Sequence, residues 1–199
     1  MLIFDPFALD RIGIQLPNLL QFVIAAFGVI RAGLVLVNTN PLYTERESVH
    51  QFQDSGTKAL VTLLSRAEET LSWIDKTDIQ WLCITEVTDM LDIKAVTECE
   101  SSRISKNCQF FNNVLLEGEQ LSFTPVTNQL DALVALQYTG GTTGLSKGAM
   151  LTHGNLLANM MQVKSRIGRV MAIGEDIFVA PLPIYHIYAF LVNLGTVPK

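Results

Sequence analysis

The chain has 199 residues, of which 49% are hydrophobic and 17% are charged, and its net charge is −5. This length allows one sizeable domain with its own core, and the apolar fraction fits an α/β sheet that is buried on both faces. The acidic balance, without a stripe of lysine and arginine, argues against nucleic acid as a partner. The three cysteines, Cys83, Cys99 and Cys108, follow no metal-binding spacing and are expected to be reduced thiols of a cytosolic protein.

Strands and helices are predicted to alternate through the first part of the chain. Apolar runs and alternation predict strands at residues 11–16, 34–37, 59–64 and 79–84. A helix is predicted from Pro17 and Asn18 to about Ala32, with Gly33 as its C-terminal stop. Two further helices are expected to end near Gly56 and Lys76, and their N-termini are capping boxes formed by Thr44 with Glu47 and by Ser65 with Glu68. This order indicates βαβ units and a mostly parallel sheet with helices on both faces.

The first helix contains an apolar run, residues 19–30, that invites a membrane interpretation. The run is about twelve residues long before Arg31, whereas spanning a bilayer takes roughly twenty. A buried core helix is therefore the preferred interpretation. No secretory signal is evident, because Asp5 interrupts the apolar start and the first basic residue is Arg11.

The second part of the chain continues the same alternation after a stretch, residues 89–123, that is hard to read. Strands are predicted at 132–137, 148–152 and 177–180, and helices at 89–96, 112–119 and about 153–167. Residues 124–129 have the composition of a linker, and residues 181–188 are expected to form a loop. Because open α/β sheets bind ligands at the carboxyl ends of their strands, the segments after residues 137 and 180 are the expected site.

Residues 138–148 carry the most informative motif, Tyr-Thr-Gly-Gly-Thr-Thr-Gly-Leu-Ser-Lys-Gly. Glycines let the backbone approach a ligand closely, and successive amides in such a turn can converge on an anion. The threonine hydroxyls donate further hydrogen bonds, and Lys147 supplies a positive charge. The combination predicts a loop between two strands that binds a polyphosphate. The simpler alternative is a flexible glycine-rich turn.

A Walker A loop, Gly-x-x-x-x-Gly-Lys-[Ser/Thr], is the obvious rival for this motif. Here Lys147 follows Ser146 instead of a glycine, and Gly148 stands where a serine or threonine would hold magnesium. The segment after the loop also has the pattern of a strand, whereas a Walker loop leads into a helix. A P-loop-type NTPase is therefore the rival enzyme class, and it predicts ATP hydrolysis without any carboxylate substrate.

At these residues the chain resembles the adenylate-forming enzymes, which include acyl-CoA synthetases, luciferases and peptide-synthetase adenylation domains. Their signature is similar to Tyr-Thr-[Ser/Gly]-Gly-Thr-Thr-Gly-x-Pro-Lys-Gly, and the chain differs from it only at Ser146, where proline is usual. Residues 181–188 resemble the family's Leu-Pro-x-[Phe/Tyr]-His segment. Residues 16–20 and 38–44 resemble bacterial long-chain fatty-acid CoA ligases in particular. The resemblance covers most of residues 10–197 and is weak over 95–125.

The resemblance implies an α/β fold in which residues 1–199 form part of an N-terminal adenylation domain, without the C-terminal domain. It implies a reaction in two steps. A carboxylate attacks the α-phosphorus of ATP to give an acyl-adenylate and pyrophosphate, and the thiol of CoA then displaces AMP. The implied co-substrates are ATP with Mg²⁺, CoA and a fatty acid. The implied location is the cytoplasm; peripheral contact of the full-length parent with the inner membrane and its oligomeric state are left open.

The resemblance also assigns roles to individual residues. Lys147 would neutralise phosphate charge as pyrophosphate leaves, and Thr139 would in addition contact Mg²⁺. His186 would lie near the acyl carboxylate. The alternatives are a solvated surface lysine and a satisfied core histidine. The nucleotide-binding residues implied in this way are Tyr138, Thr139, Gly140, Gly141, Thr142, Thr143, Gly144 and Lys147.

Three aromatic side chains after residue 184 have two alternative roles, and the two other histidines have no catalytic role. Tyr185, Tyr188 and Phe190 either line an acyl pocket or simply pack. His50 and His153 are interpreted as structural or surface residues.

Several parts of the family's site have no counterpart here: the Tyr-Gly-x-Thr-Glu segment, the aspartate that binds the ribose, and the catalytic lysine of the C-terminal domain. Adenylation needs nucleotide, carboxylate and lysine held together in near-attack geometry. We therefore expect a long-chain fatty acid–CoA ligase as the full-length parent and an isolated chain that is inactive. Two alternatives are a piece of another acyl- or aryl-adenylating enzyme and a non-catalytic truncated remnant. The remnant would neither bind ATP nor unfold cooperatively.

Overall fold

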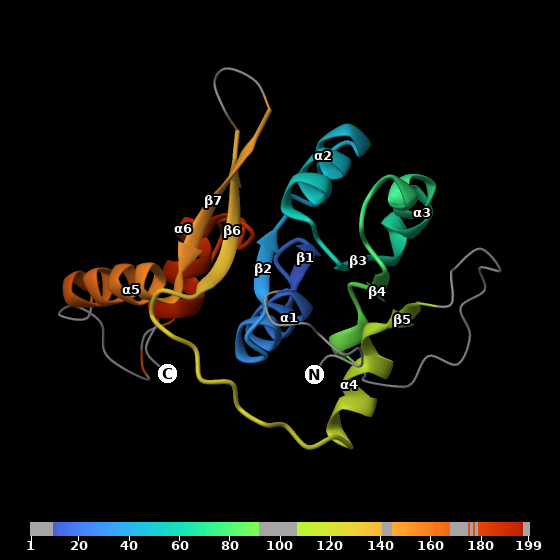
Figure 1. Cartoon of the computed structure of the whole chain (residues 1–199). Coiled ribbons are helices and arrows are strands. Elements are labelled where there is room, and N and C mark those ends of the chain that lie inside the picture. The colour runs from blue at the N-terminus through green and yellow to red at the C-terminus, as the bar shows by residue number, and fades with distance from the viewer. Residues whose placement is uncertain are drawn as a thin grey trace.

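Seven strands form a single, mostly parallel sheet in the computed structural model, which describes residues 10–91, 107–140, 145–167, 175, 177 and 179–196 (Figure 1). The strands are β1 (Arg11–Gln15), β2 (Val35–Asn38), β3 (Ala59–Leu63), β4 (Trp81–Thr85), β5 (Cys108–Phe110), β6 (Leu133–Thr139) and β7 (Lys147–Thr152). Their order across the sheet is β5-β4-β3-β1-β2-β6-β7. All neighbours run parallel except β6 and β7, which form an antiparallel hairpin at one edge. The predicted fold class is therefore confirmed.

Helices lie between most of the consecutive strands and follow the last one. The α-helices are α1 (Leu20–Arg31), α2 (Glu45–Ser55), α3 (Ala67–Trp73), α4 (Phe111–Glu119), α5 (His153–Ile167) and α6 (Ile187–Ala189). Shorter 3-10 turns are η1 (Leu64–Arg66), η2 (Ile74–Lys76) and η3 (Asp89–Leu91), and a π-helix, η4 (Phe190–Thr196), follows α6. Within the described ranges, no helix combines the length and the apolarity that crossing a bilayer requires.

The alternation of side chains along the strands divides the core between the two faces of the sheet. Ile12 and Ile14 of β1 pack with Phe22 of α1, in a cluster that α4, α5 and η4 also join. The other face carries a second cluster, in which Leu60 packs with side chains of α2 and α3. Gly13 of β1 lies on this second face, where an added Cβ would come within 2.9 Å of a Phe52 ring carbon. A glycine there lets α2 pack closely on the sheet.

The end of α1 and both ends of α2 follow the sequence signals, whereas α1 begins at Leu20, later than the predicted start at Pro17 and Asn18, and has no side-chain cap. Thr44 caps α2 with a complete capping box, because its hydroxyl accepts from the Glu47 amide while the Glu47 carboxylate accepts from the Thr44 amide. Gly56 ends α2 with φ of 63°, and Gly33 follows α1 with φ of 74°, both in the left-handed region that glycine adopts without strain. These predictions are confirmed.

The capping box predicted at Ser65 is wrong. Ser65 lies inside the 3-10 turn η1, and α3 begins after Arg66 without a side-chain cap. The chain tightens into η1 directly after β3, so the residue before α3 is already in a helical conformation, whereas an N-cap residue is extended.

Two further differences concern strands. Residues 177–180 were expected to form a strand, but Ile177, Val179 and Ala180 are in none, and Phe178 lies outside the described residues. Ile177 and Val179 are 92% and 76% exposed, so no neighbouring strand covers them. Conversely, β5 was not predicted, because it is only three residues long and depends on pairing with β4. Of the helix expected at 89–96, η3 is present and residues 92–96 lie outside the described ranges.

Candidate functional site

The predicted phosphate loop joins the two strands of the β6–β7 hairpin, as expected from its sequence. The hairpin extends past the rest of the sheet, beside α2 (Figure 1). Gly141, Thr142, Thr143 and Gly144 lie outside the described residues, so the positions of these loop amides stay a prediction. The two ends of the loop are described. Thr139, the last residue of β6, is paired with Lys147, the first residue of β7.

This register places the Thr139 hydroxyl and the Lys147 ammonium together. Residues directly opposite each other in an antiparallel pair project from the same face. Thr139, Gly140 and Lys147 are all exposed. No acidic side chain in the described part of the chain is within ion-pair distance of Lys147, so its charge is available to a ligand. A hydroxyl donor and an ammonium side by side are suited to bind phosphate oxygens.

The other face of the hairpin is attached to α2. Tyr138 pairs with Gly148 across the strands, and a Cβ at Gly148 would lie 2.9 Å from the Tyr138 ring, so only a glycine leaves room for this ring. The Tyr138 hydroxyl donates to the carboxylate of Asp54 at 2.5 Å. Burial, followed by this bond to Asp54, raises the pKa of Tyr138, which keeps the phenol neutral. Tyr138, predicted to bind nucleotide, thus has its hydroxyl engaged in holding β6 against α2.

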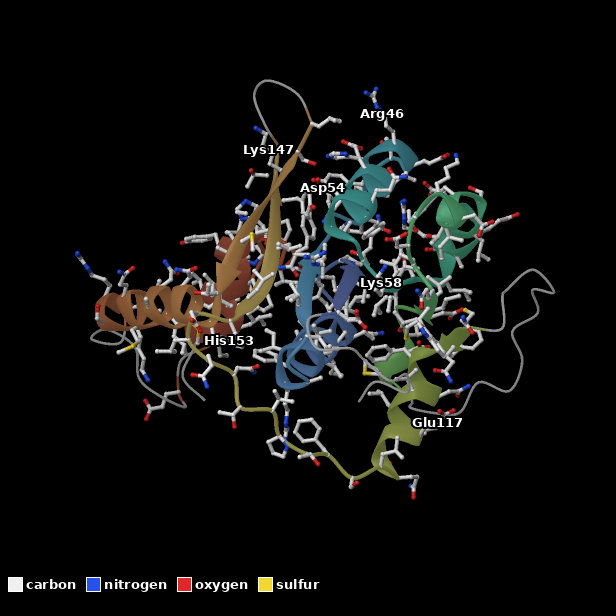
Figure 2. All side chains as sticks on the ribbon, in the orientation of Figure 1. Arg46, Asp54, Lys58, Glu117, Lys147 and His153 are labelled. Atoms are coloured by element: carbon white, nitrogen blue, oxygen red, sulfur yellow. The ribbon has the colours of Figure 1, made fainter. Side chains whose placement is uncertain are left out.

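A second contact from α2 reaches the far end of the loop. His50 Nε2 lies 3.0 Å from the carbonyl oxygen of Ser146, the residue before Lys147. Because a carbonyl can only accept, Nε2 carries the proton in this bond. Figure 2 shows Lys147 on the hairpin and Asp54 on the neighbouring helix. The interpretation of His50 as a structural residue is consistent with this contact, although its partner was not foreseen.

The segment with His186 lies on the same face of the hairpin as Thr139 and Lys147. Gln137, two residues before Thr139 on β6 and therefore on the same face, donates to the carbonyl of Tyr185 at 3.3 Å. His186 is exposed and is the N-cap of α6, where its Nδ1 accepts from the Tyr188 amide at 3.4 Å. The structure therefore brings Thr139, Lys147 and the segment that carries His186 to one side of one sheet edge, whereas Tyr138 faces α2 on the other side.

Polar side chains at the carboxyl ends of the strands hold these segments in place. Asn38, at the end of β2, donates to the Gln137 side chain at 3.2 Å, and Gln51 of α2 donates to the Asn38 carbonyl at 3.0 Å. Asn18, after β1, accepts from the Ile184 amide at 2.8 Å and donates to the Leu182 carbonyl at 2.9 Å. The His186 segment is thus positioned by Asn18 and Gln137, and not by the strand that was expected to precede it.

The residues present can accommodate Mg²⁺ that arrives with a nucleotide. Mg²⁺ takes oxygen ligands, keeps several waters and needs few protein groups. The exposed Thr139 hydroxyl, opposite Lys147, offers one oxygen of this kind. No group of three or more His, Cys, Asp or Glu side chains suited to a metal occurs in the described ranges.

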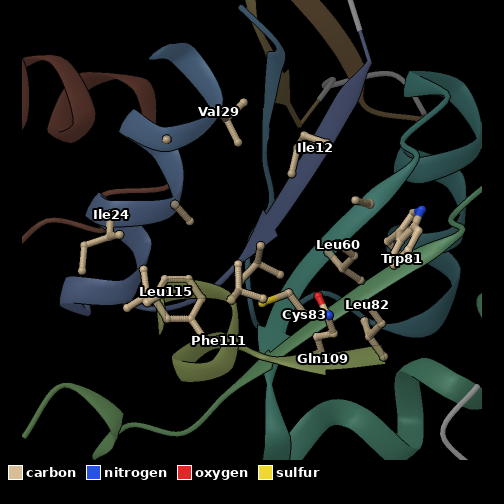
Figure 3. Close-up of a pocket in the computed structure, with 15 residues that line it drawn as sticks. Ile12, Ile24, Val29, Leu60, Trp81, Leu82, Cys83, Gln109, Phe111 and Leu115 are labelled. Carbon is tan, nitrogen blue, oxygen red and sulfur yellow. The ribbon is translucent and has the colours of Figure 1, made fainter. Parts of the chain in front are cut away.

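An apolar pocket lies elsewhere, between α1, α4 and the strands β1, β3, β4 and β5 (Figure 3). Its free volume is about 100 Å³, and none of its described lining residues is charged. Cys83 lines it, and burial raises the pKa of this thiol to about 12. The pocket is separated from the hairpin by β2, so it does not belong to the site described above.

The aromatic side chains after His186 divide into two kinds. Phe190 is buried and contacts the rings of Phe22 and Phe27 on α1, with centroids 6.5 and 6.4 Å away. Packing is therefore the function of Phe190 in this structure. Tyr188 is exposed and Tyr185 is half-buried.

Comparisons with known proteins identify the family and the relatives of this chain. Residues 8–197 match the family of AMP-binding enzymes. The long-chain-fatty-acid–CoA ligase of Salmonella typhimurium is 38% identical over 194 residues, which cover 92% of this chain and 35% of that protein. The enzyme of the same name from Bacillus subtilis is 32% identical, and the match covers 90% of this chain and 34% of that protein.

Solved structures show the same likeness. The crystal structure of a long-chain-fatty-acid-CoA ligase from Archaeoglobus fulgidus has a TM-score of 0.69 and 25% identity, and the match covers 92% of this chain and 32% of that chain. ATP-bound MatB from Rhodopseudomonas palustris has a TM-score of 0.71 and 23% identity, and the match covers 96% of this chain and 33% of that chain. At this identity the likeness supports the fold alone.

The chain therefore spans about a third of the length of these relatives. The range matched by the family includes the β6–β7 hairpin and the segment that carries His186. The mostly parallel sheet with helices on both faces is the architecture of the N-terminal domains of adenylate-forming ligases. The chain belongs to the family of AMP-binding enzymes.

Proposed function

We propose that this chain is the phosphate-binding part of an ATP-dependent long-chain fatty acid–CoA ligase. The observation that carries the proposal is the register of the hairpin, which sets Thr139 opposite Lys147 on the face shared with the His186 segment. That arrangement suits a nucleotide whose phosphates lie at the hairpin while a carboxylate lies beside His186. The choice of a long-chain fatty acid rests on the names of the relatives at 38% identity.

In this proposal the chain's own residues have separate tasks. Lys147 offsets negative charge on the phosphates and on the pyrophosphate that leaves. Thr139 donates a hydrogen bond and offers an oxygen to Mg²⁺, and the glycine-rich loop supplies amides to the phosphate oxygens. His186 orients the acyl carboxylate. It need not act as a base, because a fatty carboxylate is already ionised at neutral pH.

The proposal includes CoA as the acceptor of the acyl group, in a cytoplasmic parent enzyme. It also includes the expectation that the 199-residue chain does not catalyse adenylation by itself. The groups identified here bind phosphates and approach a carboxylate. Adenylation also requires the α-phosphorus to be held in line with that carboxylate.

Binding of Mg-ATP to the isolated chain tests the phosphate site. We expect saturable binding by calorimetry, and we expect Lys147→Ala to weaken it about 10- to 100-fold, because a charge-assisted contact contributes about 1.5–3 kcal/mol. Lys164→Ala removes the same charge from an exposed position on α5 and is the matched control, with unchanged affinity expected. Equal affinities for the two variants would remove the support for Lys147 as a phosphate ligand.

An ATP–pyrophosphate exchange assay tests the chemistry. With a long-chain fatty acid, the isolated chain is expected to give no exchange above background. Turnover by the isolated chain would refute the expected inactivity. Hydrolysis of ATP without any fatty acid would favour the rival class of NTPase.

A further inference from the structure

Helix α2 holds both ends of the phosphate loop. His50 contacts the carbonyl of Ser146 at 3.0 Å, at the end of the loop that leads into β7. Asp54 accepts from Tyr138 at 2.5 Å, at the end where β6 leads into the loop. His50 and Asp54 are four residues apart on one helix and therefore project from the same side. One helix thus contacts the two described ends of the loop, at Tyr138 and at Ser146.

The hairpin needs such support because it lies at the edge of the sheet. β6 is paired with β2 on one side, but β7 is bonded only to β6 among the described strands. The geometry at Lys147 therefore depends on the hairpin and on whatever holds it. His50 fixes the residue directly before Lys147, and Asp54 fixes the strand opposite it.

We propose that His50 and Asp54 are positioning residues that hold the two described ends of the phosphate loop, and with them Thr139 and Lys147, in the arrangement that binds nucleotide. This inference rests on the proposed function, since it assigns to α2 the task of setting the loop geometry. Neither residue is assigned a contact with nucleotide. They act through the Ser146 carbonyl and the Tyr138 hydroxyl, which are backbone and side-chain groups at the two ends of the loop.

The chemistry of each contact predicts which substitutions preserve it. His50 donates from Nε2 to a carbonyl, and a glutamine places an amide N–H donor at a similar reach, so His50→Gln is expected to keep the bond and His50→Ala to lose it. Asp54 accepts from a phenol, so Asp54→Ala and Tyr138→Phe each break the same bond. Their effects on affinity are therefore expected to be non-additive.

A matched control exists on the same helix. Gln53 donates its side-chain amide to the carbonyl of Lys76 at 2.6 Å, away from the hairpin. Gln53→Ala removes a side-chain-to-carbonyl bond of the same kind from α2 without touching the loop. Any general loss of stability in α2 is expected to appear equally in Gln53→Ala and His50→Ala.

Two measurements on the whole chain test the inference. The first is native-state cleavage by trypsin after Lys147, followed by mass spectrometry without nucleotide. We expect His50→Ala to increase the cleavage rate about fivefold, the change that corresponds to one net hydrogen bond, while His50→Gln and Gln53→Ala stay near the unmodified rate. The second is the affinity for Mg-ATP by calorimetry, which we expect to fall about fivefold in His50→Ala and to recover in His50→Gln.

The outcomes separate this inference from the proposed function. Unchanged cleavage after Lys147 in His50→Ala would overturn the positioning role, whatever the nucleotide result. Faster cleavage with an unchanged Mg-ATP affinity would also overturn it, because the loop would then bind equally well without its support. A failure of the unmodified chain to bind Mg-ATP would refute the proposed function and would reduce His50 and Asp54 to stabilising contacts.

Discussion

Replacing Gly148 by alanine is expected to destabilise the protein, although alanine is the better residue for a strand. The added Cβ would lie 2.9 Å from two carbons of the Tyr138 ring and 3.2 Å from its hydroxyl oxygen. Carbon atoms pack best at about 3.5–4.0 Å, so the ring must retreat by about 0.6 Å or more. Tyr138 is only 7% exposed, and its hydroxyl is bonded to Asp54, so this movement strains both its packing and that bond.

The size of the effect follows from two opposing contributions. Overpacking at a well-filled position costs about 1–3 kcal/mol. Replacing a strand glycine recovers about 0.5–1 kcal/mol of conformational entropy. The net free energy of unfolding is therefore expected to fall by about 1–2 kcal/mol. For a chain of this length, the midpoint of thermal unfolding should fall by about 3–6 °C.

Urea unfolding followed by circular dichroism measures this change. Gly28→Ala is the matched control, because Gly28 lies inside α1 and an added Cβ would meet nothing within 4 Å. That variant should gain about 0.5–1 kcal/mol. In a Tyr138→Ala background, Gly148→Ala should no longer destabilise. If Gly148→Ala stabilises the protein as much as Gly28→Ala does, the assigned contact between Tyr138 and Gly148 is wrong.

Three further predictions concern the cap of α2, its dependence on pH, and thiol chemistry. Thr44→Ala should cost about 1 kcal/mol by removing the N-cap of α2, and Ser65→Ala, at the box that does not form, should cost much less in the same urea titration. Hydrogen bonds from Thr44 lower the pKa of Glu47, so the stabilisation by the Glu47 carboxylate should be present above about pH 4.3 and be lost as the pH falls through the folded pKa. If the difference in unfolding free energy between Glu47→Gln and the unmodified chain does not depend on pH, this prediction is wrong. Iodoacetamide should modify Cys83 at pH 8 at least about a hundredfold more slowly in the native chain than in denaturant, because burial of the thiol raises its pKa to about 12. Equal rates of modification in the two conditions would refute the burial of this thiol.

Local signals in the sequence were sufficient where a residue's effect is confined to its own neighbourhood. The capping box at Thr44 and the left-handed turns at Gly33 and Gly56 depend on backbone groups three or four residues away, so they could be predicted. The same reasoning failed at Ser65, because the tight turn after β3 competed with the cap. It also failed at residues 177–180, because a strand exists only where another strand pairs with it.

The site was predicted in part for the same reason. The motif at residues 138–148 predicted a loop between two strands, and the hairpin has that form. The motif could not reveal that Tyr138 faces α2 while Thr139 and Lys147 face the His186 segment. It could not identify His50 or Asp54 as neighbours, since their partners lie 96 and 84 residues away in the chain.

The sequence by itself determined the family, the alternation of strands and helices, and the chemical groups available for a phosphate. These properties reside in residue types and short spacings, which are visible along a chain. The tertiary structure decided which of those groups meet, because the order of the strands and the register of β6 against β7 bring distant segments to one edge. Contacts such as those of α2 with the hairpin arise from that packing, and no local pattern encodes them.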